Sequence, residues 1–198
     1  TQTLSRLIAW LIHLSGKYVG LACRDGLFLD RRQVEQNNAA TWSAGHRLLM
    51  NRAVEAAVFE NGAESILRDG LAYDRCHVGV VTDLDGFESL AEFDISESDQ
   101  LVKVLRSQVD VVLPEGAAVL NAHDERIANL ASLCDGHAIL YGVDPQLPAM
   151  AQHRASGGRA AFMRQGIVVL ATGAFENTLS ELSSLTLRQG RGTPISPE

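Results

Sequence analysis

Polar side chains that could bind a metal ion or a phosphate follow directly after three apolar runs. Glu60 ends the run "VEAAVFE", Asp83 and Asp85 follow "HVGVVT", and Asn121 and Asp124 follow "GAAVLN". A carboxylate at the end of a strand could hold Mg²⁺, which takes a few protein oxygens and completes its coordination with water and phosphate oxygens. The three stretches therefore form the candidate site.

Each of these residues also has a structural interpretation. Glu60 could cap a helix or form a salt bridge, and the sequence leaves this alternative open beside the metal ligand. Asp is common in turns between a strand and a helix, where it hydrogen-bonds its own backbone, so we favour a turn role for Asp83 and Asp85. Asp124 precedes a helical pattern, and its favoured role is the helix N-cap.

Other residue types that could carry chemistry lack a supporting pattern. Lys103 lies within "DQLVKVLRSQV", where a lysine usually extends from a helix face to water. The six histidines and three cysteines are scattered without metal-type spacing, and the cysteines are typical of small buried side chains in a reducing cytosol. "SGGR" at 156–159 precedes a strand, which favours a tight turn over a phosphate loop, because phosphate loops precede helices.

The elements that must position these residues alternate along the chain. Helical patterns, such as 41–51 with Thr41 or Ser43 as the cap and 96–109 with a serine cap, alternate with short apolar strands. This alternation predicts an α/β fold with a mostly parallel sheet flanked by helices on both faces. Ligands of such sheets bind beyond the carboxyl ends of the strands, where the candidate residues fall.

The pattern changes after Pro145. The run "AAFMRQGIVVLATG" predicts two extended segments around 164–166, a β-hairpin at the margin of the sheet. The polar, turn-rich "RQGRGTPISPE" predicts a linker or tail. We therefore expect one domain over 1–187 and a tail over 188–198.

Composition indicates a globular protein and excludes several classes. The chain is 46% hydrophobic and 21% charged, which is too apolar for disorder. Its net charge of -7 argues against nucleic acid as a partner, because backbone binding needs clustered Lys and Arg. No apolar run reaches the roughly 18 residues of a membrane span and no signal-peptide pattern opens the chain, so we expect a cytoplasmic location and no membrane partner.

Five segments, taken in order, share a pattern with one known family. They are "SRLIAWLI", "WSAGHRLLMN", "AAVFENGAESILRDGLAYDRCHVGVVTDL", "PEGAAVLNAHDERIANLA" and "HRASGGRAAFMRQGIVVL". This order resembles the ligase domain of the cyanophycin synthetase family, within the Mur ligase superfamily, over nearly the whole chain. The resemblance implies the central-domain fold of Mur ligases, a P-loop NTPase-type sheet.

The resemblance also implies a reaction. In the family, ATP phosphorylates a carboxylate, and an amine, here arginine, attacks the acyl phosphate, which joins arginine to the aspartate side chains of a polyaspartate backbone. Magnesium and loop amides neutralise the phosphates during transfer. The implied site residues are Glu60 for magnesium, Lys103 as a catalytic lysine near the metal, and Thr1, Thr3, Asn121 and Asp124 for ATP.

The sequence departs from the family around the phosphate site. Thr1 aligns with the phosphate-loop lysine, and Ala63, Glu64 and Ser65 replace Arg-Gly-Gly. Asp83 replaces the Asn of a Thr-Asn motif, and the "DGFESL" that follows has no counterpart of a magnesium-binding histidine. These replacements remove a cation and add the carboxylate of Glu64, which repels phosphate.

Two functional hypotheses follow. The first is an ATP-dependent amide ligase domain seen as a fragment. The second, which the departures favour, is a catalytically impaired domain that acts as a scaffold or polymer-binding module and binds neither ATP nor Mg²⁺. In both, we expect the N-terminal and C-terminal parts of the same polypeptide, a polyaspartate–arginine polymer and homo-oligomeric copies as partners.

Overall fold

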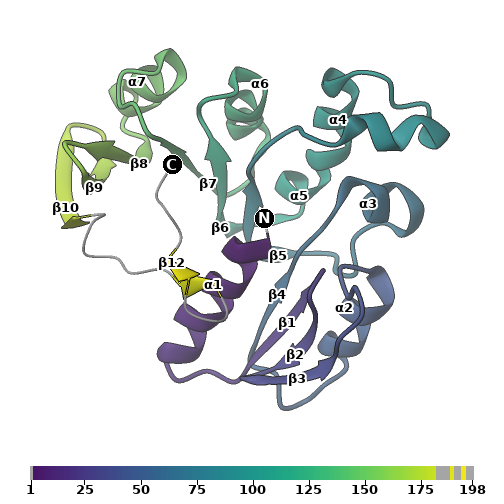
Figure 1. Ribbon diagram of the computed structural model, residues 1–198. Helices are drawn as coiled ribbons and strands as arrows, with labels where there is room; N and C mark the ends of the chain where they lie inside the picture. Colours follow the sequence, from purple (N-terminus) through teal and green to yellow (C-terminus); the bar gives the residue numbers. More distant parts are fainter. Residues whose placement is uncertain (1, 182–187, 190–192, 195–198) are drawn as a thin grey trace. The chain divides into compact units, whose positions relative to one another are not determined.

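The computed structural model describes residues 2–181, 188–189 and 193–194 (Figure 1). The chain forms two compact units. The first comprises the described residues up to Asp74 together with Glu88–Ser96, and the second comprises Arg75–Phe87 together with the described residues from Glu97 onward. The strands predicted for a single sheet are therefore divided between two sheets.

The first unit contains a four-stranded sheet in the order β3-β2-β1-β4. Strands β1 and β4 are parallel, whereas β1, β2 and β3 pair as antiparallel hairpins. Its elements are α1 (Gln2–Leu14), β1 (Val19–Cys23), β2 (Gly26–Leu29), β3 (Arg32–Glu35), α2 (Trp42–Leu49), β4 (Ala56–Phe59), α3 (Ala63–Asp69) and most of the 3-10 helix η1 (Phe87–Phe93).

Helices cover both faces of strand β1. Ala22 packs with Ala44 and Leu48 of α2, while Leu21 and Cys23, which point to the opposite face, pack with α1. The Thr41 side chain accepts a hydrogen bond from the Ala44 N–H, so the predicted cap of α2 is confirmed.

The second unit contains a six-stranded sheet in the order β10-β9-β8-β7-β6-β5. Strands β5 to β8 are parallel neighbours, and β8, β9 and β10 pair antiparallel, which confirms the hairpin predicted around 164–166. The elements are β5 (Cys76–Val81), α4 (Ser98–Leu105), α5 (Ser107–Asp110), β6 (Val112–Asn121), α6 (Glu125–Ala128), η2 (Asn129–Leu133), β7 (His137–Gly142), α7 (Pro148–Ala155), β8 (Arg159–Arg164), β9 (Ile167–Thr172) and β10 (Phe175–Glu181).

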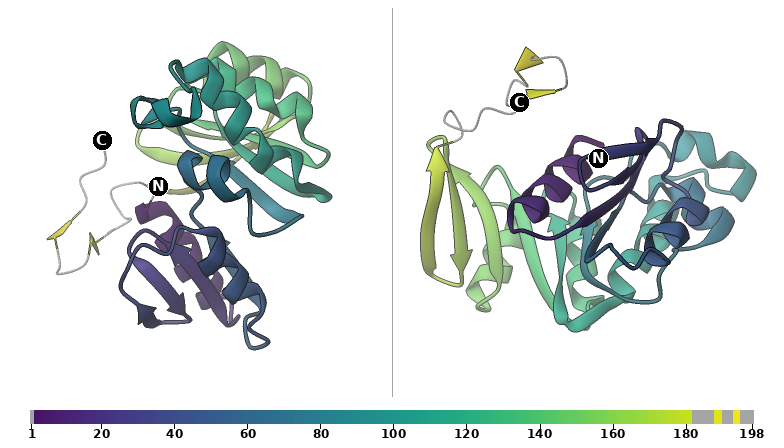
Figure 2. Two further views of the ribbon diagram at one scale, coloured as in Figure 1. Left: turned by 90° about the vertical axis from the view of Figure 1, so that its right-hand side faces the viewer. Right: turned by 90° about the horizontal axis from the view of Figure 1, so that it is seen from below.

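Burial alternates along these strands, as a sheet with one packed face requires. Ala118, Leu120, Leu140 and Phe162 are buried, and helices of this unit pack against the sheet (Figure 2). Two details differ from the sequence analysis. A serine cap was predicted for α4, but the N-cap is Glu97, which lies between Ser96 and Ser98 and whose backbone N–H donates to the Gln100 side chain. Helix α7 was not predicted.

Much of the predicted tail at 188–198 lies outside the described residues. Within it, β11 (Arg188–Gln189) and β12 (Thr193–Pro194) pair antiparallel. Among the helices that the structure describes, none combines the length and apolar character needed to cross a membrane.

Candidate functional site

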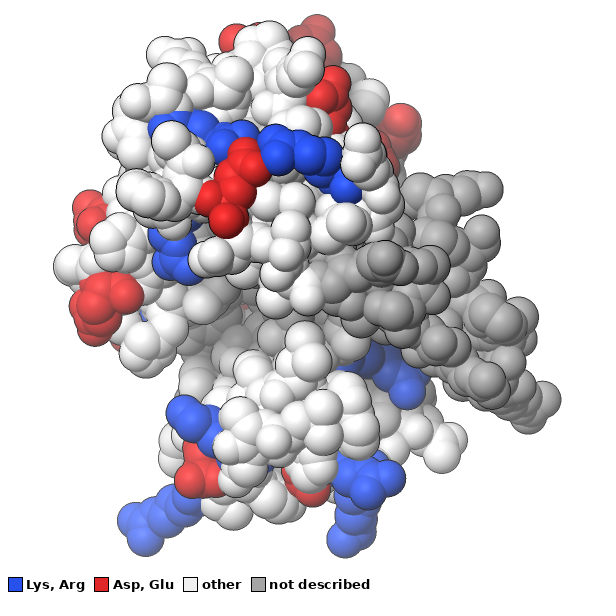
Figure 3. Space-filling view, turned by 90° about the vertical axis from the view of Figure 1, so that its left-hand side faces the viewer, with Lys and Arg blue, Asp and Glu red and all other residues white. Residues whose placement is uncertain are grey.

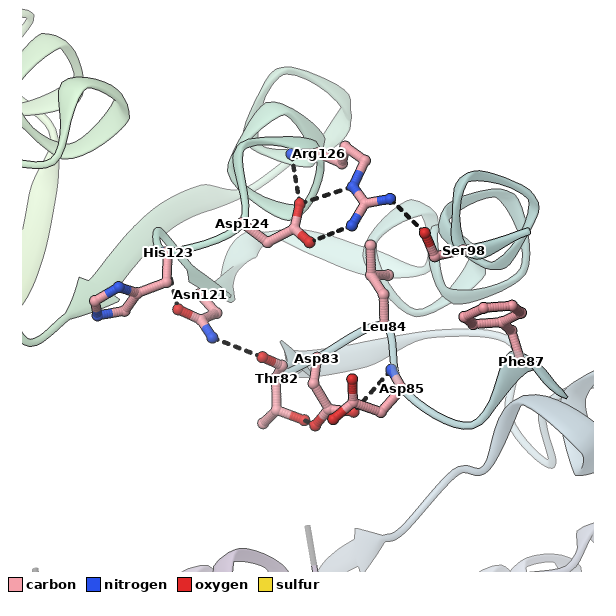
Figure 4. Close-up of a pocket in the computed structure, with 10 residues that line it drawn as sticks. All are labelled: Thr82, Asp83, Leu84, Asp85, Phe87, Ser98, Asn121, His123, Asp124 and Arg126. Carbon is pink, nitrogen blue, oxygen red and sulfur yellow. Dashed lines mark hydrogen bonds and ion pairs between the residues drawn. The ribbon is translucent and has the colours of Figure 1, made fainter. Parts of the chain in front are cut away.

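A cavity of about 360 Å³ lies in the second unit where strands β5 and β6 end (Figure 4). It is formed by the loop after β5, the turn between β6 and α6, and the start of α4. The lining residues are Thr82, Asp83, Leu84, Asp85, Phe87, Ser98, Asn121, His123, Asp124 and Arg126. The carboxyl ends of neighbouring parallel strands thus create a pocket, as predicted from the sheet type.

Asn121 joins the ends of the two strands. Its Nδ2 donates to the Thr82 carbonyl oxygen at 2.8 Å, and its Oδ1 accepts the His123 N–H at 3.0 Å. The amide therefore holds the β5 loop against the turn that leads into α6. Because both ends of the side chain are engaged, the orientation of Asn121 in the cavity wall is fixed.

Asp124 is the N-cap of α6, which confirms the role favoured from the sequence. Its Oδ1 accepts the backbone N–H of Arg126 at 2.9 Å. The Arg126 guanidinium binds both carboxylate oxygens, with Nε 3.0 Å from Oδ1 and Nη2 2.6 Å from Oδ2. The hydrogen bonds from the guanidinium hold the pKa of Asp124 below its usual value.

Arg126 connects three elements around the cavity. Besides Asp124, its Nη1 donates to the Ser98 hydroxyl and to Asp99 Oδ1, each at 2.6 Å. The hydrogen bonds to Asp124 and then to Asp99 raise the guanidinium pKa further above its ordinary value. Four of the five N–H donors of this guanidinium are therefore already bound by protein acceptors.

Asp83 has the turn role that we favoured. Its Oδ2 accepts the Thr82 hydroxyl at 2.6 Å, and its Oδ1 accepts the Asp85 N–H at 3.4 Å. Among the residues that the structure describes, no Lys, Arg or His forms an ion pair with Asp83 or Asp85. The lining thus carries two carboxylates without a cationic partner.

A second cavity, of about 290 Å³, shares Asn121 and His123 with the first and is lined mainly by apolar side chains. His123 Nε2 accepts the Val143 N–H at 3.0 Å, which places the proton of the neutral ring on Nδ1. Burial, and then the nearby charge of Asp83, raise the pKa of Tyr141. A neutral, largely apolar wall therefore adjoins the acidic cavity.

Glu60 lies in the first unit, directly after β4. Its side chain is only 5% exposed, and its Oε2 accepts the backbone N–H of Arg24 at 3.0 Å. The Arg24 Nε lies 3.7 Å from the other carboxylate oxygen. The structure thus shows the salt-bridge alternative, while the magnesium role of Glu60 stays a prediction.

The structure brings only part of the predicted set together. Asn121 and Asp124 line one cavity, whereas Lys103 lies exposed on α4 and does not belong to that lining. Thr3 is exposed in α1 of the first unit, and Thr1 lies outside the described residues. Within the described part of the chain, no group of three or more His, Cys, Asp or Glu residues has the arrangement of a metal site.

The sequence analysis missed Arg126, Ser98 and His123. Arg126 had a local signal, since a basic residue two positions after an Asp N-cap can reach back to that carboxylate. Ser98 gave no such signal, because its contact with Arg126 spans 28 residues.

Comparison with known proteins gives relatives for this chain. No model of a protein family matches. Curated cyanophycin synthetases are 32% identical over 194 residues in Crocosphaera subtropica, 31% over 193 residues in Synechocystis sp. and 34% over 194 residues in Geminocystis herdmanii. Each match covers 98% of this chain and 22% of the relative, so the chain spans about a fifth of the length of these relatives.

A solved structure shares the fold. The structure of UDP-N-acetylmuramoyl-L-alanyl-D-glutamate–2,6-diaminopimelate ligase superposes with a TM-score of 0.59 over 90% of this chain and 36% of its own chain, at 11% identity. The α/β fold, with helices flanking its sheets, is thus that of a Mur ligase-like domain. Together with this neighbour, the curated relatives support a Mur ligase-like cyanophycin synthetase domain.

Proposed function

We propose that this chain is the Mur ligase-like domain of a cytoplasmic protein that handles a polyaspartate–arginine polymer, and that it acts as a scaffold or polymer-binding module without hydrolysing ATP. The fold and the cyanophycin synthetase relatives support the ligase family. The charge of the cavity supports the loss of ATP chemistry.

The observation that carries the proposal is the distribution of charge in the cavity at the ends of β5 and β6. Among the described residues that line it, Arg126 is the one Lys or Arg, and it is bound to Asp124, Asp99 and Ser98. Asp83 and Asp85 add negative charge, and no Lys, Arg or His in the described part of the chain forms an ion pair with either of them. A triphosphate entering this cavity would meet carboxylates instead of the cations that stabilise phosphoryl transfer, so the lining does not fit the group.

Two contacts outside the cavity support the same proposal. The carboxylate of Glu60, the implied magnesium ligand, is engaged by the backbone and side chain of Arg24. Glu64, which stands where the family has glycine, pairs with Arg68 at 3.2 Å on α3. Both acids therefore have structural partners in this chain.

The test is photoaffinity labelling of the full-length protein with Mg²⁺ and an azido analogue of ATP, followed by peptide mapping. Mapping is needed because other parts of the protein could bind ATP. We expect no label on the peptides that carry 82–87 and 121–126. Label there that excess Mg-ATP prevents would contradict the proposal and support an active ligase domain.

Polymer binding is tested separately by co-sedimentation with insoluble polyaspartate–arginine polymer. We expect the protein to sediment with the polymer even when no ATP is added. Retention in the supernatant would remove the polymer-binding role and leave the scaffold role.

A further inference from the structure

Two cysteines lie at the end of the second sheet where the parallel strands begin. Cys76 is the first residue of β5, and Cys134 lies between η2 and β7. In the sheet, β6 is the neighbour of both β5 and β7. Both thiols are reduced and partly buried.

Glycines let the backbones of the three segments touch at this end. A Cβ on Gly116 would lie 2.4 Å from the His77 carbonyl oxygen, and a Cβ on Gly136 would lie 2.5 Å from the Gly116 carbonyl oxygen. Both distances are too short for a side chain, so the strands approach as only glycine allows. Cys76 adjoins the first of these contacts, and Cys134 lies two residues before the second.

An ion pair also joins the direct neighbours of the two cysteines. Arg75 Nη1 lies 3.8 Å from Asp135 Oδ2. The Cys134 Sγ lies 3.8 Å from the His137 carbonyl oxygen, at the start of β7. The ion pair thus joins the two segments that carry the thiols, and each of these segments also packs closely against Gly116 of β6.

We propose that Cys76 and Cys134 form a redox-responsive thiol pair that closes to an intramolecular disulfide when a peroxide oxidises the protein. A disulfide needs its Cα atoms within about 4.4–6.8 Å of each other, and the Arg75–Asp135 ion pair already joins the residues next to the two cysteines. The pair is a modification site of the fold and does not depend on the function proposed above.

The chemistry balances with hydrogen peroxide as the oxidant. One thiolate attacks the O–O bond, forms a sulfenic acid and releases hydroxide, which takes up a proton to become water. The second thiolate attacks the sulfenic sulfur, the S–S bond forms, and the departing oxygen leaves as water. Two thiols and one peroxide thus give one disulfide and two waters, and a thiol such as glutathione reverses the step by exchange.

Burial, and then the proximity of Cys134, raise the pKa of the Cys76 thiol above its ordinary value. The thiolate is the reactive form, so closure is slow at neutral pH and accelerates as the pH rises toward and through that pKa. The pair therefore responds to sustained oxidation.

The decisive experiment is peptide mapping of the full-length protein before and after hydrogen peroxide, with trypsin and without reductant. Cleavage after Arg75, Lys103, Arg126 and Arg154 gives one peptide over 76–103 and another over 127–154. After oxidation, we expect most of the two peptides to be joined in one species, whose mass is about 2 units below the sum of the two peptide masses. A reductant should separate this species into the two peptides. If both peptides stay separate after full oxidation, with sulfinic acids or single glutathione adducts, the proposal is wrong.

Variants provide a second readout on the same protein. The matched control is Cys23→Ser, which changes a cysteine that is buried in the first unit. In wild type and in this control, oxidation should raise the melting temperature of the domain by roughly 5–15 °C, because the disulfide closes a loop of about 60 residues. In Cys134→Ser the rise should be absent. An equal rise in Cys134→Ser would overturn the assignment, and the wild-type map decides the question if that variant does not fold.

Discussion

At the scale of single residues, Glu60 has a structural role at a position for which the family resemblance predicted a metal ligand. It is buried, and it accepts the Arg24 N–H while its second oxygen faces the Arg24 guanidinium. The loss of the acceptor for this part-buried N–H, together with the lost packing of the Glu60 side chain, should cost about 1–3 kcal/mol, whereas an amide in place of the carboxylate can still accept.

We therefore predict that Glu60→Ala lowers the free energy of unfolding by about 1–3 kcal/mol and that Glu60→Gln lowers it by less than about 1 kcal/mol. Urea unfolding of the chain, with slopes compared between variants, measures both. A cost of Glu60→Gln equal to that of Glu60→Ala would mean that the charge matters more than the acceptor.

Magnesium separates the two roles of Glu60. A ligand that binds only the folded state raises stability in proportion to ln(1 + [L]/Kd). We would add 10 mM MgCl₂, which is roughly 10 times a millimolar Kd. If the acid is structural, the difference in unfolding free energy between wild type and Glu60→Gln should stay unchanged. Stabilisation of wild type alone would restore the metal role predicted from the family.

At the scale of elements, the short helix α6 depends on its cap. A one-turn helix has few internal hydrogen bonds, so the contact from the Asp124 side chain to the Arg126 N–H is a large part of its stabilisation. We predict that Asp124→Ala costs about 1 kcal/mol in unfolding free energy and that Asp124→Ser, which keeps a cap oxygen, costs less. Equal losses in urea unfolding would assign the effect to the guanidinium contact instead of the cap.

The predictability of the elements follows from how local their signals are. Strands β1, β4, β5 and β7 and the second half of β6 are mostly apolar runs, and the hairpin of β8 and β9 has a turn at Gln165, so pattern alone finds them. Helix α7 buries only Met150 and shows little amphipathic periodicity, so the sequence gives a weak signal. The division into two sheets depends on pairing between distant segments, which composition does not encode.

The same reasoning applies to the candidate site. Asp124 as a cap and Asp83 in a turn were predictable because both bond to neighbours in sequence. The ion pair from Arg126 to Asp99 crosses 27 residues, and the burial of Glu60 against Arg24 crosses 36, so each depends on tertiary folding.

At the scale of the whole molecule, the net charge is -7, and many charged side chains of the described residues form local ion pairs. Basic and acidic side chains lie next to each other on the face shown in Figure 3. In the second unit, Arg164 and Arg154 both bind Glu176, and both guanidinium groups also lie over the Phe162 ring. Such pairing makes stability depend on the ionisation of particular carboxylates.

This arrangement predicts the direction of acid unfolding. The hydrogen bonds from Arg164 and then Arg154 lower the pKa of Glu176, as Arg126 lowers that of Asp124. A carboxylate whose pKa is lower in the folded state stabilises the fold above its unfolded pKa, about 4, and this contribution is lost as the pH falls through the folded pKa. The melting temperature should therefore fall as the pH drops below about 4.

The matched variant for this prediction is Glu176→Gln, which keeps the size of the side chain but cannot ionise. It should melt below wild type at pH 7 and approach it at pH 2–3, because at low pH the wild-type carboxyl is also neutral. Thermal melts across this range measure the difference. A gap between the two proteins that is the same at every pH would show that Glu176 acts through packing and not through its charge.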